Sequence, residues 1–309
     1  MTELVTKIQE VLAEADVVLG WVHSETAGVA VPAWFHSAAE AEAAVFDSTC
    51  VHNLAVHLPR LQDRTAGIVA KGCDIRSLVQ LISEGRVRRD RVRIISVPCP
   101  GVVDVKKVWR CFGYGKKLID AGGQVEMEGK TAPREEILLW KCRGCRDTAP
   151  LISDAVVGDP AGVAPPSPAE RTGLRERFDA MTPAGRRRFW QEQFSRCIRC
   201  NACREACPLC FCRDVCTMQT REPHWTGGQI NAREAEMAQH IRINHLAGRC
   251  TGCEECERAC PVGIPLMLLL EEQNRAVEEL FGFRAGTDPE AAPPLLTFDI
   301  NNDNWGNER

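Results

Sequence analysis

The chain has 309 residues, of which 44% are hydrophobic and 26% charged, values that are ordinary for a protein with a buried core and leave room for about two domains. Its formal net charge of −4 argues against a nucleic-acid partner, which usually requires a basic face. No apolar run approaches the roughly 18 residues of a membrane-spanning helix, and the acidic, amphipathic residues 1–14 lack the pattern of a signal peptide.

The first predicted domain, residues 1–158, alternates helices and strands. Apolar periodicity predicts a helix over 2–15, strands over 16–20 and 29–34, helices over 38–46 and 51–58, a strand over 66–70, a helix over 74–83, a strand over 91–97 and a short helix over 133–140. Strand, helix and strand at the spacing of residues 66–97 indicate a βαβ unit. The predicted fold class is therefore an α/β domain with a small, mostly parallel sheet.

A proline-rich stretch, residues 159–171, is predicted to be a semi-extended linker. The second predicted domain, residues 172–285, is mainly α-helical. Helices are expected over 182–194, 231–245 and 266–281. Thr182 and Pro183 fit the N-cap and the first position of the first of these helices. Residues 286–309 are predicted to form an extended tail.

Cysteine is the residue type that departs most from ordinary composition, with 17 in the chain. An odd number clustered at intervals of two and three residues is poor disulfide geometry, because neighbouring thiols would compete to pair locally. The same spacing suits thiolates that converge on metal. We therefore expect a reducing, cytoplasmic environment.

One cysteine motif occurs twice, and both copies match C-x₂-C-x₂-C-x₃-C-P. The first copy contains Cys197, Cys200, Cys203 and Cys207, and the second contains Cys250, Cys253, Cys256 and Cys260. In two-cluster ferredoxins, three thiolates on a tight loop bind one 4Fe–4S cubane and the fourth ligates the other cluster. We expect the fourth cysteine to open a helix and point away. The predicted ligand sets are Cys197, Cys200, Cys203 and Cys260 for one cluster, and Cys250, Cys253, Cys256 and Cys207 for the other.

Zinc is the main alternative, because paired C-x₂-C also builds zinc ribbons. Zinc does not require the crossed, proline-terminated pattern, so a bacterial-ferredoxin-type dicluster domain is the stronger prediction. Three further thiols, Cys210, Cys212 and Cys216, follow the first copy. They either help to hold another metal centre with a donor from elsewhere, or are packed or spare thiols.

Four cysteines of the first domain are candidates for a further cluster. Cys73 and Cys99 each follow a predicted strand, at the edge where α/β sheets usually place ligands, and Cys142 and Cys145 form a C-x₂-C. Four thiolates there would suffice for another 4Fe–4S cluster. The alternatives are a small buried hydrophobe for each of the first two and a dithiol redox pair for the others. Cys50 and Cys111 have no assigned partner, and we expect both to be packed.

At these residues the sequence resembles the coenzyme F420 hydrogenase/dehydrogenase beta-subunit family, which includes the beta subunits of methanogen formate dehydrogenases. The matching pieces are the Cys73-Asp74 turn, Val-Pro-Cys99 and Cys142-Arg-Gly-Cys145 with the downstream Val-Gly-Asp159. The resemblance implies a 4Fe–4S cluster on Cys73, Cys99, Cys142 and Cys145. It also implies an FAD site beside that cluster, where a deazaflavin or another two-electron carrier exchanges electrons. The chain lacks the ferredoxin-like cysteine run with which members of the family usually begin.

The predicted function is that of an iron–sulfur electron-transfer subunit in an anaerobic multisubunit oxidoreductase complex. It would relay electrons between the N-terminal cluster and the two C-terminal clusters, with a formate dehydrogenase, a hydrogenase or a heterodisulfide-reductase-like assembly as partner. The alternative is a flavin-dependent reductase or dehydrogenase beta subunit that acts on a deazaflavin or a similar carrier. A structural metal-binding adaptor is a third, weaker possibility. The sequence singles out neither catalytic residues nor individual flavin contacts.

Overall fold

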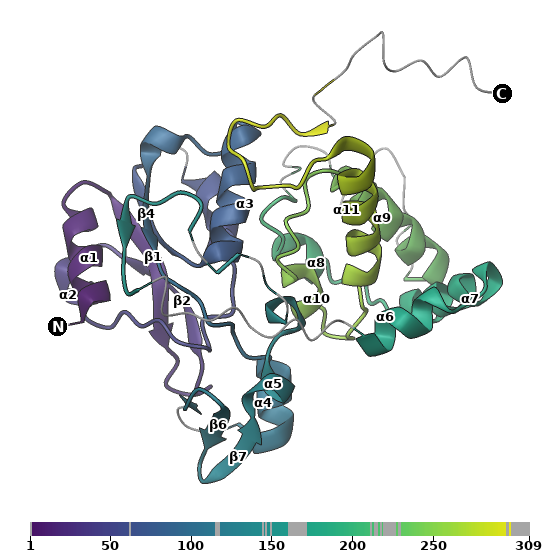
Figure 1. Cartoon of the computed structure of the whole chain (residues 1–309), viewed down its shortest axis with the longest axis horizontal. Helices are drawn as coiled ribbons and strands as arrows, with labels where there is room; N and C mark the ends of the chain where they lie inside the picture. Colours follow the sequence, from purple (N-terminus) through teal and green to yellow (C-terminus); the bar gives the residue numbers. More distant parts are fainter. Residues whose placement is uncertain are drawn as a thin grey trace.

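Three parts of the molecule are visible in Figure 1: an α/β part, a small lobe with its own sheet, and a helical part. The computed structural model describes residues 2–61, 63–114, 118–143, 145, 147–148, 150–159, 172–210, 212, 216, 218, 227, 230–294 and 297. Within these residues, no helix is long and apolar enough to cross a membrane. The predicted linker falls almost entirely on residues outside the described ranges.

The α/β part is built on a five-stranded sheet of order β2-β1-β3-β4-β8. Its strands are β1 (Val17–His23), β2 (Ala30–Phe35), β3 (Ala66–Ala70), β4 (Val92–Ser96) and β8 (Ala155–Val156). β2 pairs antiparallel with β1, whereas the other neighbours pair parallel, with Ile68 opposite Ile94 in the centre. Every residue of β3 is buried, as expected for a strand covered on both faces. The predicted α/β character is confirmed.

Two helices pack on this sheet. α1 (Glu3–Leu12) buries its apolar stripe, and its first turn is capped by Thr2, whose Oγ1 accepts the Val5 N–H at 3.3 Å. α3 (Gly72–Ser83) lies between the sheet and the helical part in Figure 1 and is buried along most of its length. These helices fix the carboxyl ends of β3 and β4. Two of the predicted N-terminal ligands, Cys73 and Cys99, lie just after those ends.

Two predicted helices are shorter or different in kind. The helix expected over 38–46 is α2 (Ala38–Ala41), because the Val45 N–H donates to the Trp21 carbonyl of β1 instead of continuing a helix. The helix expected over 51–58 is a 3₁₀ helix, η1 (Leu54–Arg60), which begins after Asn53. Tertiary hydrogen bonding therefore overrides the local helical pattern here.

Most of the helices and strands of the small lobe were not predicted from the sequence. It contains α4 (Val105–Phe112), β5 (Ile119–Asp120), β6 (Gln124–Met127), β7 (Lys130–Pro133) and α5 (Arg134–Ile137) around a separate apolar core. Glu128 and Gly129 form the two-residue turn between β6 and β7, with φ of 52° and 79°. Pro133 is the last residue of β7 rather than part of a helix, so the helix expected over 133–140 is only α5.

The helical part carries the repeated cysteine motif. Its helices are α6 (Thr172–Asp179), α7 (Pro183–Ser195), α8 (Ala202–Glu205), α9 (Ala232–His245), α10 (Glu255–Arg258) and α11 (Met267–Phe281). The Thr182 hydroxyl accepts the Gly185 N–H at 3.2 Å, so the predicted N-cap is present, and the Asn231 side chain caps α9 in the same way by accepting the Glu234 N–H at 3.0 Å. The long helices predicted from the sequence are thus found with their expected starts.

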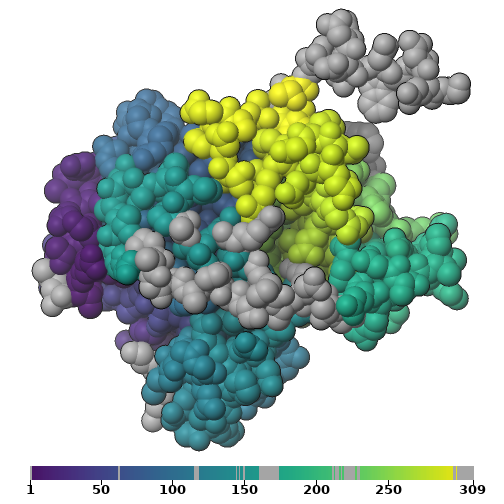
Figure 2. All heavy atoms as spheres, in the orientation of Figure 1, coloured from purple at the N-terminus to yellow at the C-terminus, as the bar shows by residue number. Residues whose placement is uncertain are grey.

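Helix α3 joins the α/β part to the helical part. One continuous apolar core runs through both. The Arg249 guanidinium pairs with Glu84 at 2.7 Å. After α11, the chain returns over α3, where the Gly286 N–H donates to Gln80 Oε1 at 3.1 Å, and Figure 2 shows this yellow segment against the blue atoms of α3. The cysteine-bearing loops of the two parts are therefore held in a fixed relation.

A buried ion pair at the start of α3 gives a stability prediction. Lys71 and Asp74 are 1% and 0% exposed, and the Lys71 ammonium lies 2.9 Å from Asp74 Oδ2 and donates to the His52 carbonyl at 2.6 Å. Lys71→Met is expected to lower the free energy of unfolding by about 3–5 kcal/mol, because it leaves a buried carboxylate without its cation. Anaerobic urea unfolding followed by circular dichroism measures this change.

The control is Arg88→Ala, which removes a cation from an exposed pair with Asp90, whose side chains are 64% and 63% exposed. Solvent screens that pair, so no measurable change in the unfolding midpoint is expected. Equal unfolding midpoints for the Lys71→Met variant and the unsubstituted chain would contradict the role given to the buried pair.

Candidate iron–sulfur centres

The two copies of the cysteine motif adopt the same backbone shape. Arg199 and Asn201 have φ of 51° and 59° in the first copy, and Gly252 and Glu254 have φ of 70° and 60° at the matching positions of the second. Non-glycine residues rarely adopt positive φ, so its repetition marks a constrained loop. Successive N–H groups in such loops form concavities that bind anionic groups, iron–sulfur clusters among them.

A four-residue helix follows each loop, and the fourth cysteine lies two residues beyond its last residue. The Cys207 N–H donates to the Arg204 carbonyl at 3.2 Å, and the Cys260 N–H donates to the Glu257 carbonyl at 3.1 Å. The expectation that the fourth cysteine opens a helix is therefore wrong: it ends one. The short helix contains the third cysteine of each copy, so the third and fourth thiols are separated by the end of a helix.

Four thiols from the two copies line one cavity. They are the members of the first predicted set, Cys197, Cys200, Cys203 and Cys260. The Gln239 amide donates to the Cys203 sulfur at 3.5 Å, and the Ile264 N–H donates to the Cys260 sulfur at 3.4 Å. Hydrogen bonds of this kind tune the potentials of iron–sulfur clusters. The donor set, the surrounding cavity and the folded loops all fit a 4Fe–4S cluster.

The members of the second predicted set, Cys207, Cys250, Cys253 and Cys256, are all buried. Burial raises the pKa of the Cys250, Cys253 and Cys256 thiols, and the neighbouring Cys207 charge raises each pKa further. The pKa of Cys207 is instead lowered to about 6, first by a hydrogen bond with Cys210. Cys207 of the first copy therefore lies close enough to the three thiols of the second for its charge to act on each of them.

The four N-terminal candidates also converge. Cys73 lies in the first turn of α3, Cys99 follows β4, and Cys142 ends a 3₁₀ helix, η3 (Trp140–Cys142), with Cys145 three residues on. Cys99 packs against the apolar cluster that contains Cys142. Burial raises the pKa of the Cys73 and Cys142 thiols to about 12, and the charge of Cys99 acts on both. The two strand ends and the C-x₂-C therefore meet at one place.

The positive charges of two lysines counteract the rise in thiol pKa that burial causes. The cations of Lys141 and Lys71 lower the pKa of Cys73, and both also act on Cys99. Metal ligands must be deprotonated, so nearby cations favour the thiolate form that iron requires. The donor set and its electrostatic surroundings fit a third 4Fe–4S cluster at Cys73, Cys99, Cys142 and Cys145.

Tight packing against α3 fixes the chain just after the C-x₂-C. A Cβ atom on Gly72 would lie 1.6 Å from the Asp147 carbonyl oxygen, so only glycine fits there. The Asp147 carboxylate is held by Arg76 at 2.9 Å and by Arg284 at 2.8 Å. The contact between Gly72 and Asp147 could not be predicted from the sequence, because only the tertiary fold brings the two residues together.

The remaining cysteines differ in their surroundings. Cys50 is fully buried, as expected for a packed thiol, and its sulfur accepts the Asp47 N–H at 3.4 Å. Cys111 is exposed on α4, so the expectation that it is packed is wrong; the helix turns Val108 and Phe112 inward instead.

The three extra thiols of the helical part gather at one cavity. Cys210, Cys212 and Cys216 line it together with His245 and the arginines Arg204, Arg242 and Arg249. Among the described residues, no group of three or more histidine, cysteine or acidic side chains has the geometry to hold a single metal ion.

Comparison with known proteins first identifies the class of the C-terminal module. Residues 193–264 match a family model described as a 4Fe-4S dicluster domain, which confirms the predicted class. The chain is also 23% identical over 299 residues to the F420-dependent formate dehydrogenase subunit beta of Methanocaldococcus jannaschii, covering 77% of this chain and 78% of that one. It is 24% identical over 300 residues to the F420-dependent formate dehydrogenase 1 subunit beta of Methanococcus maripaludis, covering 76% of each.

A chain of the F420-reducing [NiFe] hydrogenase complex from Methanosarcina barkeri is a structural neighbour. It shares 15% identity with a TM-score of 0.37, and the match covers 47% of this chain and 58% of that chain. The sequence relatives and the dicluster match confirm the predicted resemblance to the beta-subunit family. They also confirm the predicted function class, an iron–sulfur electron-transfer subunit of an oxidoreductase.

Proposed function

We propose that the chain relays electrons through three 4Fe–4S clusters, one held by the N-terminal thiols and two by the crossed C-terminal sets. The observation that carries this proposal is the adjacency of the three thiol sets across the joint between the two parts. When bound, such clusters accept and release electrons at potentials that the surrounding protein sets. The protein residues supply the thiolates, their hydrogen bonds and their burial.

The contacts support an order for the three centres. Lys141 is next to Cys142 in the chain, and its ammonium donates to the Cys253 carbonyl at 2.9 Å, so the N-terminal set adjoins the second C-terminal set. The charge of Cys203 is among those that raise the pKa of Cys256, after burial, so that second set adjoins the first. The centre at Cys207, Cys250, Cys253 and Cys256 is therefore proposed as the middle of the relay.

Exposure indicates where a partner exchanges electrons with the chain. The thiols of the middle centre are buried, whereas Cys200 of the other C-terminal set is exposed and its neighbour Ile198 is 50% exposed. We therefore place the exit of the relay at Ile198 and Cys200. The relatives are subunits of formate dehydrogenases, which supports a formate dehydrogenase, among the three partner assemblies predicted, as the partner.

A second candidate function, flavin-dependent exchange with a deazaflavin, is favoured by one cavity. It has a volume of about 620 Å³, in the range of small-molecule sites, and its lining includes His23, Asp47, Pro98 and Asp159. Pro98 directly precedes Cys99, so the cavity adjoins the N-terminal set. A two-electron carrier held there would lie at the start of the relay.

Anaerobic reconstitution with iron, sulfide and flavin counted per chain tests the proposal. About twelve irons per chain are expected, because each 4Fe–4S cluster holds four. About eight irons would remove the N-terminal centre from the relay. Bound flavin together with turnover of a hydride carrier would establish the second function. Zinc, or sulfur–sulfur bonds among the eight C-terminal positions, would overturn electron transfer.

A further inference from the structure

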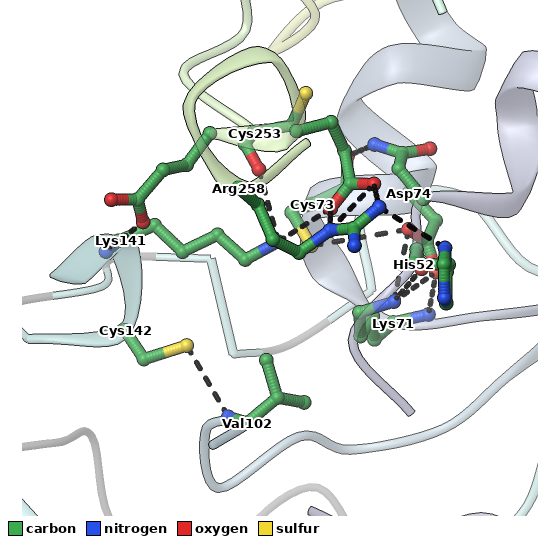
Figure 3. A network of polar contacts seen from close by, with 12 residues as sticks. His52, Lys71, Cys73, Asp74, Val102, Lys141, Cys142, Cys253 and Arg258 are labelled. Carbon is green, nitrogen blue, oxygen red and sulfur yellow. Dashed lines mark hydrogen bonds and ion pairs between the residues drawn. The ribbon is translucent and has the colours of Figure 1, made fainter. Parts of the chain in front are cut away.

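Lys141 connects two of the proposed centres directly. Its side chain is only 6% exposed. The backbone N–H of Lys141 donates to Glu254 Oε2 at 2.6 Å, and its ammonium donates to the Cys253 carbonyl at 2.9 Å and lies 3.7 Å from Glu255 Oε1. Figure 3 shows this side chain reaching from the Cys142 segment toward Cys253.

The position of this ammonium is unusual for a lysine. Lysine is almost never fully buried unless paired, and its flexible stem normally carries the charge to water. Here the charge is directed inward instead, onto the loop that presents Cys253. On the other side of that loop, Arg258 holds Glu255 at 2.7 Å, so the acceptor groups around the Lys141 ammonium are themselves fixed.

We propose that Lys141 is a positioning residue that sets the reduction potentials of two centres at once, the N-terminal centre and the middle centre. Reduction adds negative charge to a cluster, and a buried cation beside it stabilises the reduced form more than the oxidised form. Because water is excluded, the effect is screened far less than at the surface. The inference deepens the proposed relay and rests on it.

A shared cation has a specific consequence for the relay. It would raise the potentials of both neighbouring centres together, so both would accept electrons more readily while the difference between the two potentials would change little. The reduced centre loses one electron and the oxidised centre gains it, while the ammonium keeps its proton throughout. Within the described part of the chain, the polar contacts of Lys141 are with Glu254, Cys253 and Glu255. The centre at Cys197, Cys200, Cys203 and Cys260 is therefore expected to be unaffected.

The test is a redox titration of the full chain, isolated anaerobically and followed by electron paramagnetic resonance. Lys141→Met is expected to lower the reduction potentials of two of the three centres. Each potential should fall by about 59 mV, which corresponds to a tenfold smaller equilibrium constant for one-electron reduction. Lys141→Arg should keep both near their original values. Lys7→Met, which removes an exposed lysine from α1, serves as the matched control and should shift none.

The opposite charge change supplies a second, independent variant. Glu255→Gln removes the buried carboxylate beside Lys141 and is expected to raise the potential of the middle centre. If Lys141→Met loses its clusters, the direction of the Glu255→Gln shift decides: an upward shift supports the inference, and no shift overturns it. Unchanged potentials in Lys141→Met with about twelve irons retained overturn the inference but leave the relay standing. About eight irons in the unsubstituted chain would instead count against the relay.

Discussion

Cys260→Ser is expected to abolish the cluster of the first motif copy, although Cys260 belongs to the second. It lines the cavity formed with Cys197, Cys200 and Cys203, so its loss leaves that site with three thiolates. The iron content should fall by about four per chain, since one cubane is lost. Electron paramagnetic resonance should show the same missing signal as Cys200→Ser, because both variants damage one centre.

The reciprocal pair makes the crossing testable. Cys207→Ser should remove the same signal as Cys253→Ser, since the structure brings Cys207 to the thiols of the second copy. Cys212→Ser, in an exposed cysteine between the copies, is the matched control and should leave both C-terminal signals in place. Signals that are lost copy by copy, with Cys260→Ser resembling Cys253→Ser, would show that the ligands do not cross.

Much of the fold could be predicted where local chemistry decides the structure. Thr182 and Asn231 begin helices because each side chain accepts an N–H of the first turn, an interaction that depends only on nearby residues. The buried strand β3 and the helix α3 follow from apolar periodicity. The two copies of the cysteine motif could be recognised for the same reason, because the spacing of the cysteines along the chain determines how the loop presents their thiols.

Features that depend on distant contacts were not accessible in this way. The shortened α2 results from a backbone bond between Val45 and Trp21, more than twenty residues apart in the chain. The hairpin at Glu128 and Gly129 did carry a local signal, a glycine at the second turn position, but its strands are short and partly exposed. The contact of Lys141 with the Cys253 carbonyl could not be predicted, because nothing in the sequence near Lys141 indicates that partner.

The thiols of the N-terminal set also combine features that the local sequence predicts with features that depend on distant contacts. Motifs placed Cys73 and Cys99 at strand ends, and the parallel pairing of β3 and β4 brings those ends to one edge. Their meeting with the C-x₂-C depends on Gly72, where the Asp147 backbone comes too close for any side chain.

Cys142→Ser is expected to reduce the iron content from about twelve to about eight per chain, with both C-terminal signals retained. Cys142 is the most buried of the four candidates, and its sulfur accepts the Val102 N–H at 3.3 Å, so the serine variant keeps the local packing while losing a thiolate. Serine is a poor substitute because iron–sulfur clusters are held by cysteine thiolates. Iron and acid-labile sulfide assays on anaerobically purified protein measure the change.

Cys111→Ser is the matched control, since Cys111 is an exposed thiol of the same half of the chain and lies outside the converging set. Its iron content should equal that of the unsubstituted protein. Retention of about twelve irons in Cys142→Ser would exclude Cys142 as a ligand of the third cluster. About eight irons in both the variant and the unsubstituted chain would contradict the third cluster and leave the C-x₂-C as a dithiol pair or a packing element. Because the C-terminal centres share no ligand with this set, loss of their signals would instead mean that Cys142 supports the joint between the two parts.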